Sequence, residues 1–185
     1  MTFAEKFLKK KSVGRDLLDE FKLRGEYVKK FGFAILVPDT VEKLKKYSPI
    51  LEVGAGSGYW AMELQKAGID VIATDPRAGD SEYSKRWNIP YLEIEKLTGV
   101  KAVKKYLYRN LLMVWPCYNR PWAYQTLIDF RGKYFIYVGE GDGGCTADDK
   151  FHEYLESDFQ EVEKIHIPQF NAIHDYLAVF ERREK

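Results

Sequence analysis

The chain has 185 residues, of which 45% are apolar and 31% are charged. This length supports one ordinary hydrophobic core, so we expect a single domain with one functional site. The longest apolar runs are far shorter than the roughly 18 residues of a membrane-spanning helix, and we expect no membrane partner. The basic N-terminus lacks the uninterrupted apolar segment of a secretory signal, which predicts a cytoplasmic location.

Cysteine usage and charge distribution narrow the class of partner. Cys117 and Cys145 are far apart in the sequence and the three histidines are scattered, so neither a disulfide framework nor a metal site is expected. Residues 1–30 carry nine Lys or Arg and five Asp or Glu, whereas residues 140–163 carry nine Asp or Glu and one Lys. A basic N-terminus suits an anionic partner, but the acidic stretch would repel phosphates. A nucleic-acid partner is therefore an open alternative that the charge pattern does not favour.

The N-terminal part of the chain predicts helices. Apolar residues recur at roughly helical spacing over residues 4–30, which indicates one or two helices. An extended segment is expected to continue through Pro38. A short helix capped by Asp39 or Thr40 is expected to follow it.

After residue 48 the pattern changes to short apolar strands that alternate with helical windows, which is typical of a parallel sheet covered on both faces. Strands are expected at 50–53, 70–74, 91–94, 111–115, 133–138, 161–166 and 176–180. Helices are expected near 57–67, 80–87, 97–106, 121–130 and 148–156. The last two strands are joined by a loop too short for a parallel crossover, so we expect them to be antiparallel neighbours.

These elements predict an α/β fold with a seven-stranded, mostly parallel, doubly wound sheet that ends in an antiparallel hairpin. Residues 1–185 are expected to form one domain. Within it, residues 1–48 would be an N-terminal helical extension and residues 49–185 a Rossmann-like core.

A glycine-rich loop after the first predicted strand is the clearest sign of a binding site. The loop consists of Gly54, Ala55, Gly56, Ser57 and Gly58. Its glycines permit a tight turn and let the backbone approach a bound ligand closely. A helix and a second strand follow, and that strand ends at Asp75, 17 positions after Gly58. Asp75 is thus placed to accept hydrogen bonds from ribose hydroxyls.

Two classes of cofactor use this layout, and the loop spacing distinguishes them. The dinucleotide fingerprint is G-x-G-x-x-G, with a pyrophosphate at the helix N-terminus. Here the spacing is G-x-G-x-G, and Tyr59 stands where that fingerprint has its third glycine. Glu52, two residues before the first glycine, suits a ligand with an ammonium group better than one with two phosphates. S-adenosylmethionine is therefore favoured over NAD, and a nicotinamide-dependent oxidoreductase is the weaker alternative.

The ordered set of strand, glycine loop, helix, strand and acidic residue resembles the class I, or Rossmann-like, methyltransferases. The segments FGFAILVPD, LLMVWPCYNRPWAYQTL, YVGEGDGGCTADD and IPQFNAIHDYL more narrowly resemble a largely uncharacterised methyltransferase-like group. The resemblance implies the fold and S-adenosylmethionine as cofactor rather than a substrate. The implied cofactor-binding residues are Glu52, Gly54, Ala55, Gly56, Ser57, Gly58, Asp75 and Pro76.

The sequence WPCYN follows the predicted strand at 111–115 and overlaps its last residue. Amino-methyltransferases carry an Asp/Asn/Ser-Pro-Pro-aromatic motif here, whose polar first residue and backbone carbonyl accept hydrogen bonds from the target amine. The chain keeps Pro116 and Tyr118 but has Trp115 for the polar residue and Cys117 for the second proline. Tryptophan has only a donor, so N-methylation would rest on backbone carbonyls and Asn119. The resemblance implies Trp115, Pro116, Tyr118 and Asn119 as catalytic residues.

Three further residues are expected to bind the substrate at the carboxyl ends of the strands, where ligands bind in such folds. Glu140 would act as a base or bind a cationic substrate, and His174 would accept a proton. Both have a structural alternative as loop anchors. Phe33 is expected to line the pocket together with Trp115.

Two other tryptophans, Trp60 and Trp122, lie inside predicted helices and are expected to pack between helix and sheet. The function expected from the whole pattern is an S-adenosylmethionine-dependent methyltransferase that acts on an unidentified small or macromolecular acceptor by in-line transfer of the sulfonium methyl. The alternative is a catalytically silent S-adenosylmethionine-binding module that interacts with a protein. That alternative stays open because Trp115 stands where the amino-methyltransferase motif has a polar residue.

Overall fold

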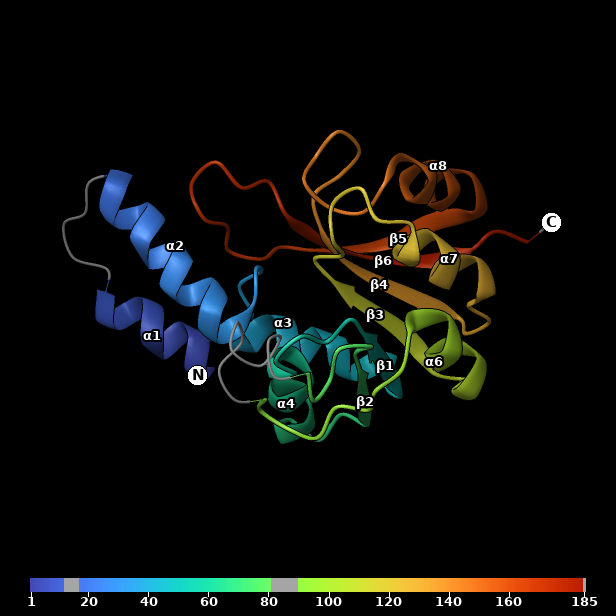
Figure 1. Ribbon diagram of the computed structural model, residues 1–185, viewed down its shortest axis with the longest axis horizontal. Helices are drawn as coiled ribbons and strands as arrows, with labels where there is room; N and C mark the ends of the chain where they lie inside the picture. Colours follow the sequence, from blue (N-terminus) through green and yellow to red (C-terminus); the bar gives the residue numbers. More distant parts are fainter. Residues whose placement is uncertain (12–16, 81–89, 185) are drawn as a thin grey trace.

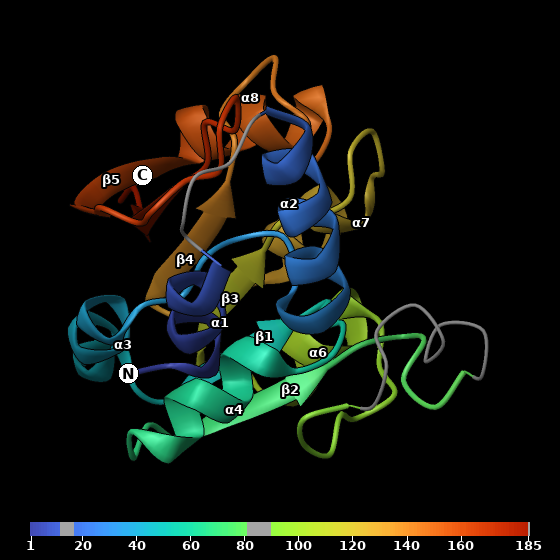
Figure 2. The same cartoon turned by 90° about the vertical axis from the view of Figure 1, so that its left-hand side faces the viewer.

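The computed structural model describes residues 1–11, 17–80 and 90–184. In this part of the chain a six-stranded sheet runs through the molecule, with helices on both of its faces (Figures 1 and 2). The strands are β1 (Ile50–Val53), β2 (Val71–Thr74), β3 (Asn110–Val114), β4 (Tyr134–Gly139), β5 (Phe159–Ile165) and β6 (Tyr176–Arg182). The helices are α1 (Phe3–Lys11), α2 (Leu17–Phe31), α3 (Pro38–Leu44), the 3-10 turn η1 (Lys45–Tyr47), α4 (Tyr59–Lys66), α6 (Gly99–Lys105), α7 (Trp122–Asp129) and α8 (Asp149–Asp158).

The strand order is β2-β1-β3-β4-β6-β5. Strands β2, β1, β3 and β4 are parallel, and β6 runs antiparallel to both β4 and β5. The mostly parallel sheet with a terminal antiparallel hairpin is thereby confirmed. No helix among the described residues is long and apolar enough to cross a membrane.

The strand expected at 91–94 is wrong, and the sheet of the described residues has six strands and not seven. The chain beside β2 forms only an isolated parallel bridge between Glu95 and Thr74. In that bridge the amide of Glu95 donates to the Ala73 carbonyl (2.9 Å), and the amide of Asp75 donates to the Glu95 carbonyl (3.0 Å). The outer side of β2 is therefore paired at one residue and not along a whole strand.

Packing against the glycine loop explains why 91–94 does not extend the sheet. The amide of Tyr91 donates to the Ser57 carbonyl (2.9 Å). The side chain of Leu92 lies 2.5 Å from the position that a Cβ on Gly58 would occupy. The apolar residues that predicted a strand thus cover the loop instead. The expected helix at 80–87 lies, apart from its first residue, outside the described residues.

Helix α3 begins earlier than the sequence predicts. Val37 is its N-cap residue and Pro38 its first residue, and no side chain caps the helix. Proline suits this position because its ring fixes φ and the first helical N–H has no partner in the helix. Asp39 therefore lies in the first turn, where it pairs with Lys43 at 2.7 Å (i, i+4), and the expected cap at Asp39 or Thr40 is wrong.

The two faces of the sheet carry separate apolar cores, because successive side chains of a strand point to opposite faces. Ile50 and Leu112 pack with residues of α1 to α4. Leu51 and Leu111 pack with residues of α6, α7 and α8. Helices thus cover both faces, and the loops at the carboxyl ends of β1, β2 and β3 are left to form a site.

Gly99 permits the close approach of α6 and α7. A Cβ at Gly99 would lie 2.1 Å from Oγ1 of Thr126 and 2.9 Å from Cγ1 of Val53. The Thr126 hydroxyl cannot easily retreat, since it donates to the Trp122 carbonyl at 2.6 Å. We expect Gly99→Ala to destabilise the protein by about 1–3 kcal/mol through overpacking, which lowers the melting temperature by about 2–12 °C.

The matched control is Gly25→Ala in α2. No atom lies within 4 Å of a Cβ at Gly25, so alanine there is expected to stabilise the helix by about 0.5–1 kcal/mol. Thermal melts of the two variants compare these effects. Equal melting temperatures for Gly99→Ala and the wild type would contradict the packing argument.

Candidate functional site

A cavity of about 390 Å³ lies at the carboxyl ends of β1, β2 and β3. Its walls come mainly from four segments. They are the end of β1 with the glycine loop (52–57), the turn after β2 (75–77), the end of β3 and the residue after it (114–115), and the end of α2 with the two residues after it (31–33). The chain thus brings four segments that are distant in sequence to one place. This is the edge of the sheet at which open α/β folds bind ligands.

The glycine loop turns sharply at this edge. Gly54, Gly56 and Gly58 have φ values of 72°, 58° and 73°, which glycine adopts without the steric penalty of other residues. The amides of Gly54 and Ala55 both donate to the Thr74 carbonyl, at 2.9 and 3.1 Å. The loop is therefore tied to the end of β2, with its backbone on the cavity wall.

Asp75 is 3% exposed and joins the turn after β2 to the loop. Its Oδ2 accepts a hydrogen bond from the amide of Gly56 (3.1 Å), and its Oδ1 accepts one from the amide of Arg77 (2.8 Å). Pro76 and Ser57 also line the cavity. A carboxylate is thus held rigidly on the wall.

Glu52 is a second buried acid on the cavity wall, with 2% of its surface exposed. Its Oε2 accepts a hydrogen bond from the amide of Ala61 at 3.0 Å. Burial and the negative charge of Asp75 raise the pKa of Glu52 and the Ala61 amide opposes them, so that the pKa is about 8. A cation in the cavity would favour the ionised form of Glu52.

Aromatic rings form much of the opposite wall. Phe33 and Trp115, the two residues expected to line a pocket, both lie on it and stack with ring centroids 5.5 Å apart and planes 17° apart. Trp60 and Trp122 line the cavity as well, although the sequence predicted packing alone. They do so because α4 and α7 both begin at this edge of the sheet, which puts residues of their first turns beside the site.

Trp115 has an uncommon backbone conformation, with φ at 53°. For a bulky residue this left-handed region costs roughly 1–2 kcal/mol. The amide of Trp115 is fixed by a hydrogen bond to the Val138 carbonyl (2.7 Å), and the ring by its stacking on Phe33. Such strain clusters at functional sites and persists only where the surroundings enforce it.

The residues after Trp115 form an exposed loop pinned to Ala147. The amide of Ala147 donates to the Pro116 carbonyl (3.0 Å), and the amide of Asn119 donates to the Ala147 carbonyl (2.6 Å). Tyr118 is 64% exposed. Cys117 is the residue of this loop that lines the cavity, and Pro116, Tyr118 and Asn119 do not.

Glu140 connects two loops, and neither it nor His174 lines this cavity. Its Oε1 accepts the amide of His174 (2.9 Å), and its Oε2 accepts the amide of Cys145 (2.8 Å). Burial raises the pKa of Glu140, but these hydrogen bonds outweigh it, and the pKa is lowered overall. The side chain therefore acts as the loop anchor that was its structural alternative.

The sequence did not point to Arg77 and Thr98 as site residues, yet both line the cavity, as do the aromatic residues Phe31 and Tyr59. Arg77 follows Asp75 and Pro76 directly, so its proximity to the carboxylate was a usable signal. Thr98 accepts a hydrogen bond from the amide of Lys101 as the N-cap of α6. Nothing in the local sequence connects α2 or α6 to the glycine loop.

Neither a family model nor a curated protein matches the chain. Among solved structures, magnesium protoporphyrin IX methyltransferase from Synechocystis PCC 6803 is 10% identical, with 93% of this chain and 100% of that chain covered and a TM-score of 0.55. The 1,6-didemethyltoxoflavin N1-methyltransferase of Burkholderia thailandensis is 17% identical, with 98% and 87% covered and a TM-score of 0.53. The N-methyltransferase NodS of Bradyrhizobium japonicum is 16% identical, with 79% and 85% covered and a TM-score of 0.53.

These three solved structures are methyltransferases, and the likeness to them extends over most of this chain. At such low identity the likeness defines the fold and does not reach the activity. The chain has the class I methyltransferase fold.

Proposed function

We propose that the chain binds S-adenosylmethionine in the 390 Å³ cavity and transfers its sulfonium methyl to an acceptor. The observation that carries this proposal is the Asp75 carboxylate, hydrogen-bonded to the Gly56 amide on the cavity wall. A fixed carboxylate beside a close glycine backbone suits a ribose. Structures with this fold contain S-adenosylmethionine or S-adenosylhomocysteine, which supports the same cofactor here.

The residues of the cavity fit the parts of this cofactor. Asp75 would accept hydrogen bonds from the ribose hydroxyls, and Pro76 would lie near the adenine. Glu52 would face the ammonium group of the methionine end, because among the described residues no cationic side chain lowers its pKa. Bound there, the cofactor would supply an electrophilic methyl group on a sulfonium.

The protein's contribution to the transfer is mainly positioning and exclusion of water. Phe33 and Trp115 would contact, by their aromatic faces, the end of the acceptor that meets the methyl group. Trp115 has no hydrogen-bond acceptor, so it would not take a proton from the acceptor. We therefore propose an acceptor whose nucleophilic atom is methylated without help from a proton-accepting side chain at position 115.

Thermal melts with S-adenosylhomocysteine and with NAD test the cofactor. A ligand at 100 times its Kd adds about 2.7 kcal/mol of stability, which raises the melting temperature by roughly 5–10 °C in a domain of this size. We expect this shift with S-adenosylhomocysteine only. A shift with NAD alone would favour a nicotinamide-dependent oxidoreductase and contradict the proposal.

A catalytically silent binding module is the second candidate. Trp115 replaces the polar acceptor of amino-methyltransferases, and the Pro116 carbonyl is engaged by Ala147. Incubation with methyl-labelled S-adenosylmethionine and cell extract separates the two candidates. Label transfer to any extract component excludes the silent module, whereas cofactor binding without transfer favours it.

A further inference from the structure

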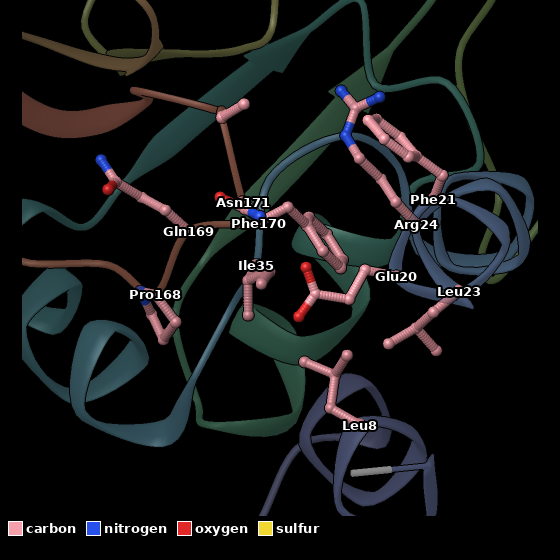
Figure 3. A pocket seen from close by; sticks show the side chains of 11 residues that line it. Leu8, Glu20, Phe21, Leu23, Arg24, Ile35, Pro168, Gln169, Phe170 and Asn171 are labelled. Atoms are coloured by element: carbon pink, nitrogen blue, oxygen red, sulfur yellow. The ribbon is translucent and has the colours of Figure 1, made fainter. Parts of the chain in front are cut away.

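A second cavity, of about 280 Å³, lies between α1, α2 and the loop that joins β5 to β6 (Figure 3). Its walls are mostly apolar. The larger apolar side chains that line it are Leu8, Phe21, Leu23, Ile35, Pro168 and Phe170, and the carboxylate of Glu20 lines it as well. Figure 3 shows Leu8, Ile35 and Phe170 reaching the same space from three different elements. Such a space suits the apolar part of a small molecule.

The second cavity adjoins the first. Arg24 lines the second cavity, and its guanidinium carbon lies 6.0 Å from the ring centroid of Trp115, which lines the first. Tyr27 lies between them on α2, with ring centroids 5.0 Å from Phe31 of the first cavity and 5.1 Å from Phe170 of the second. The side of the second cavity that carries Arg24 thus lies next to Trp115 of the first cavity.

Two polar atoms beside this cavity are buried without a partner. Nε of Arg24 and Oδ1 of Asp175 have no hydrogen-bond partner, and no ion pair joins these two described residues. Asp175 is 2% exposed and does not itself line the cavity, but its carbonyl accepts the side-chain amide of Gln169, which does, at 2.6 Å. An unsatisfied buried polar group costs about 1–3 kcal/mol, so two of them in one place require an explanation.

The charges around Asp175 agree with a ligand site. Burial and the negative charge of Glu140 raise the pKa of Asp175 and Arg24 opposes both effects, so that the pKa is about 6. Arg24 is thus close enough to attract Asp175 without pairing with it. A ligand between them would satisfy one unused donor and one unused acceptor.

We propose that the second cavity is the methyl-acceptor site and that the acceptor is a small molecule with an apolar body, which presents an accepting oxygen to Arg24 and an O–H or N–H to Asp175. This inference rests on the proposed function of the first cavity. A lone pair on oxygen or nitrogen of the acceptor bonds to the methyl carbon as the C–S bond breaks. The electron pair of that bond stays on sulfur, and the proton of the acceptor leaves to water.

Binding of simple probes tests the cavity independently of activity. The three hydroxybenzoate isomers carry both polar groups on an apolar ring, while benzoate and phenol carry one each. We expect ligand-observed NMR, with and without S-adenosylhomocysteine, to give at least one hydroxybenzoate a Kd tenfold or more below those of benzoate and phenol. Ile35→Trp, which fills the cavity, should remove that binding.

Arg24→Gln keeps the binding test decisive if Ile35→Trp fails to fold. We expect it to raise the Kd of the preferred hydroxybenzoate at least tenfold, to about the Kd of phenol. Arg183→Gln is the matched control, because Arg183 lies on the exposed C-terminal segment and donates to the Glu156 carbonyl. Absence of any hydroxybenzoate preference, or unchanged binding in Arg24→Gln, would overturn the assignment.

Label transfer into size-fractionated extract tests the acceptor class. We expect label from methyl-labelled S-adenosylmethionine in the small-molecule fraction with wild type, and its loss in Arg24→Gln while the melting shift with S-adenosylhomocysteine persists. Label in RNA or protein would overturn the small-molecule acceptor and leave the proposed function intact. Absence of a shift with S-adenosylhomocysteine in wild type would instead refute the proposed function, and the hydroxybenzoate result would still decide what the cavity binds.

Discussion

Replacing Asp75 by alanine is expected to weaken the binding of S-adenosylhomocysteine at least 100-fold and to abolish its thermal shift. Hydrogen bonds to a charged group contribute about 1.5–3 kcal/mol each, so losing those to two ribose hydroxyls weakens binding by roughly 10² to 10⁴. The substitution also frees the amides of Gly56 and Arg77, which Asp75 holds in the structure. Isothermal titration of the folded variant measures the effect.

Asp70→Ala is the matched control. Asp70 lies just before β2, at the amino end of the strand, whereas Asp75 lies at its carboxyl end. The side chain of Asp70 is 60% exposed and forms an ion pair with Arg109 at 2.8 Å. We expect its removal to leave the Kd for S-adenosylhomocysteine within about twofold of wild type, because Asp70 does not line the cavity. A folded Asp75→Ala variant that binds as well as Asp70→Ala would refute the assignment of the ribose site.

Glu52 is expected to make the stability of the ligand-free protein fall as the pH rises. Its folded-state pKa is about 8, against an ordinary value of 4.5. The folded protein therefore keeps a proton that the unfolded chain releases, and the stabilisation is complete below pH 4.5 and lost by about pH 8. The limiting slope for one group is about 1.4 kcal/mol per pH unit.

Glu52→Gln should flatten this dependence. Between pH 5.5 and 7.5 we expect urea unfolding of the variant to lose about 1 kcal/mol less per pH unit than the wild type. Glu156→Gln, on the exposed face of α8, removes the same formal charge and should keep the wild-type slope. Parallel slopes for Glu52→Gln and the wild type would show that Glu52 is already ionised in the folded state.

The same residue links cofactor binding to pH with the opposite sign. A cationic ammonium group binds the ionised form of Glu52, so the affinity for S-adenosylhomocysteine should increase several-fold per pH unit between pH 6 and 8. The affinity of Glu52→Gln should be lower at pH 8 and nearly independent of pH. Identical titration profiles for the two proteins would place the ammonium group elsewhere.

Much of the fold follows from local sequence patterns. All six strands, β1 to β6, were predicted within one or two residues, because apolar runs, helical spacing and short connections are local properties. The prediction of a strand at 91–94 failed because it also used local apolar content, which indicates that a segment is buried but not which part of the protein it packs against. There the partner is the glycine loop and not the sheet edge.

The amino-acid sequence by itself determined the position of the glycine loop and of Asp75 after β2, because a turn that requires glycine and the acid that closes it lie within one β-α-β unit. Only the tertiary structure decided that Trp60 and Trp122 line the site and that Glu140 anchors two loops. It alone brought α2 against the loop near Phe170 to form the second cavity. Glu140 and His174 are 34 residues apart in the sequence, and α2 and Phe170 are more than 100 apart. Such pairings depend on how whole layers pack, which no local periodicity records.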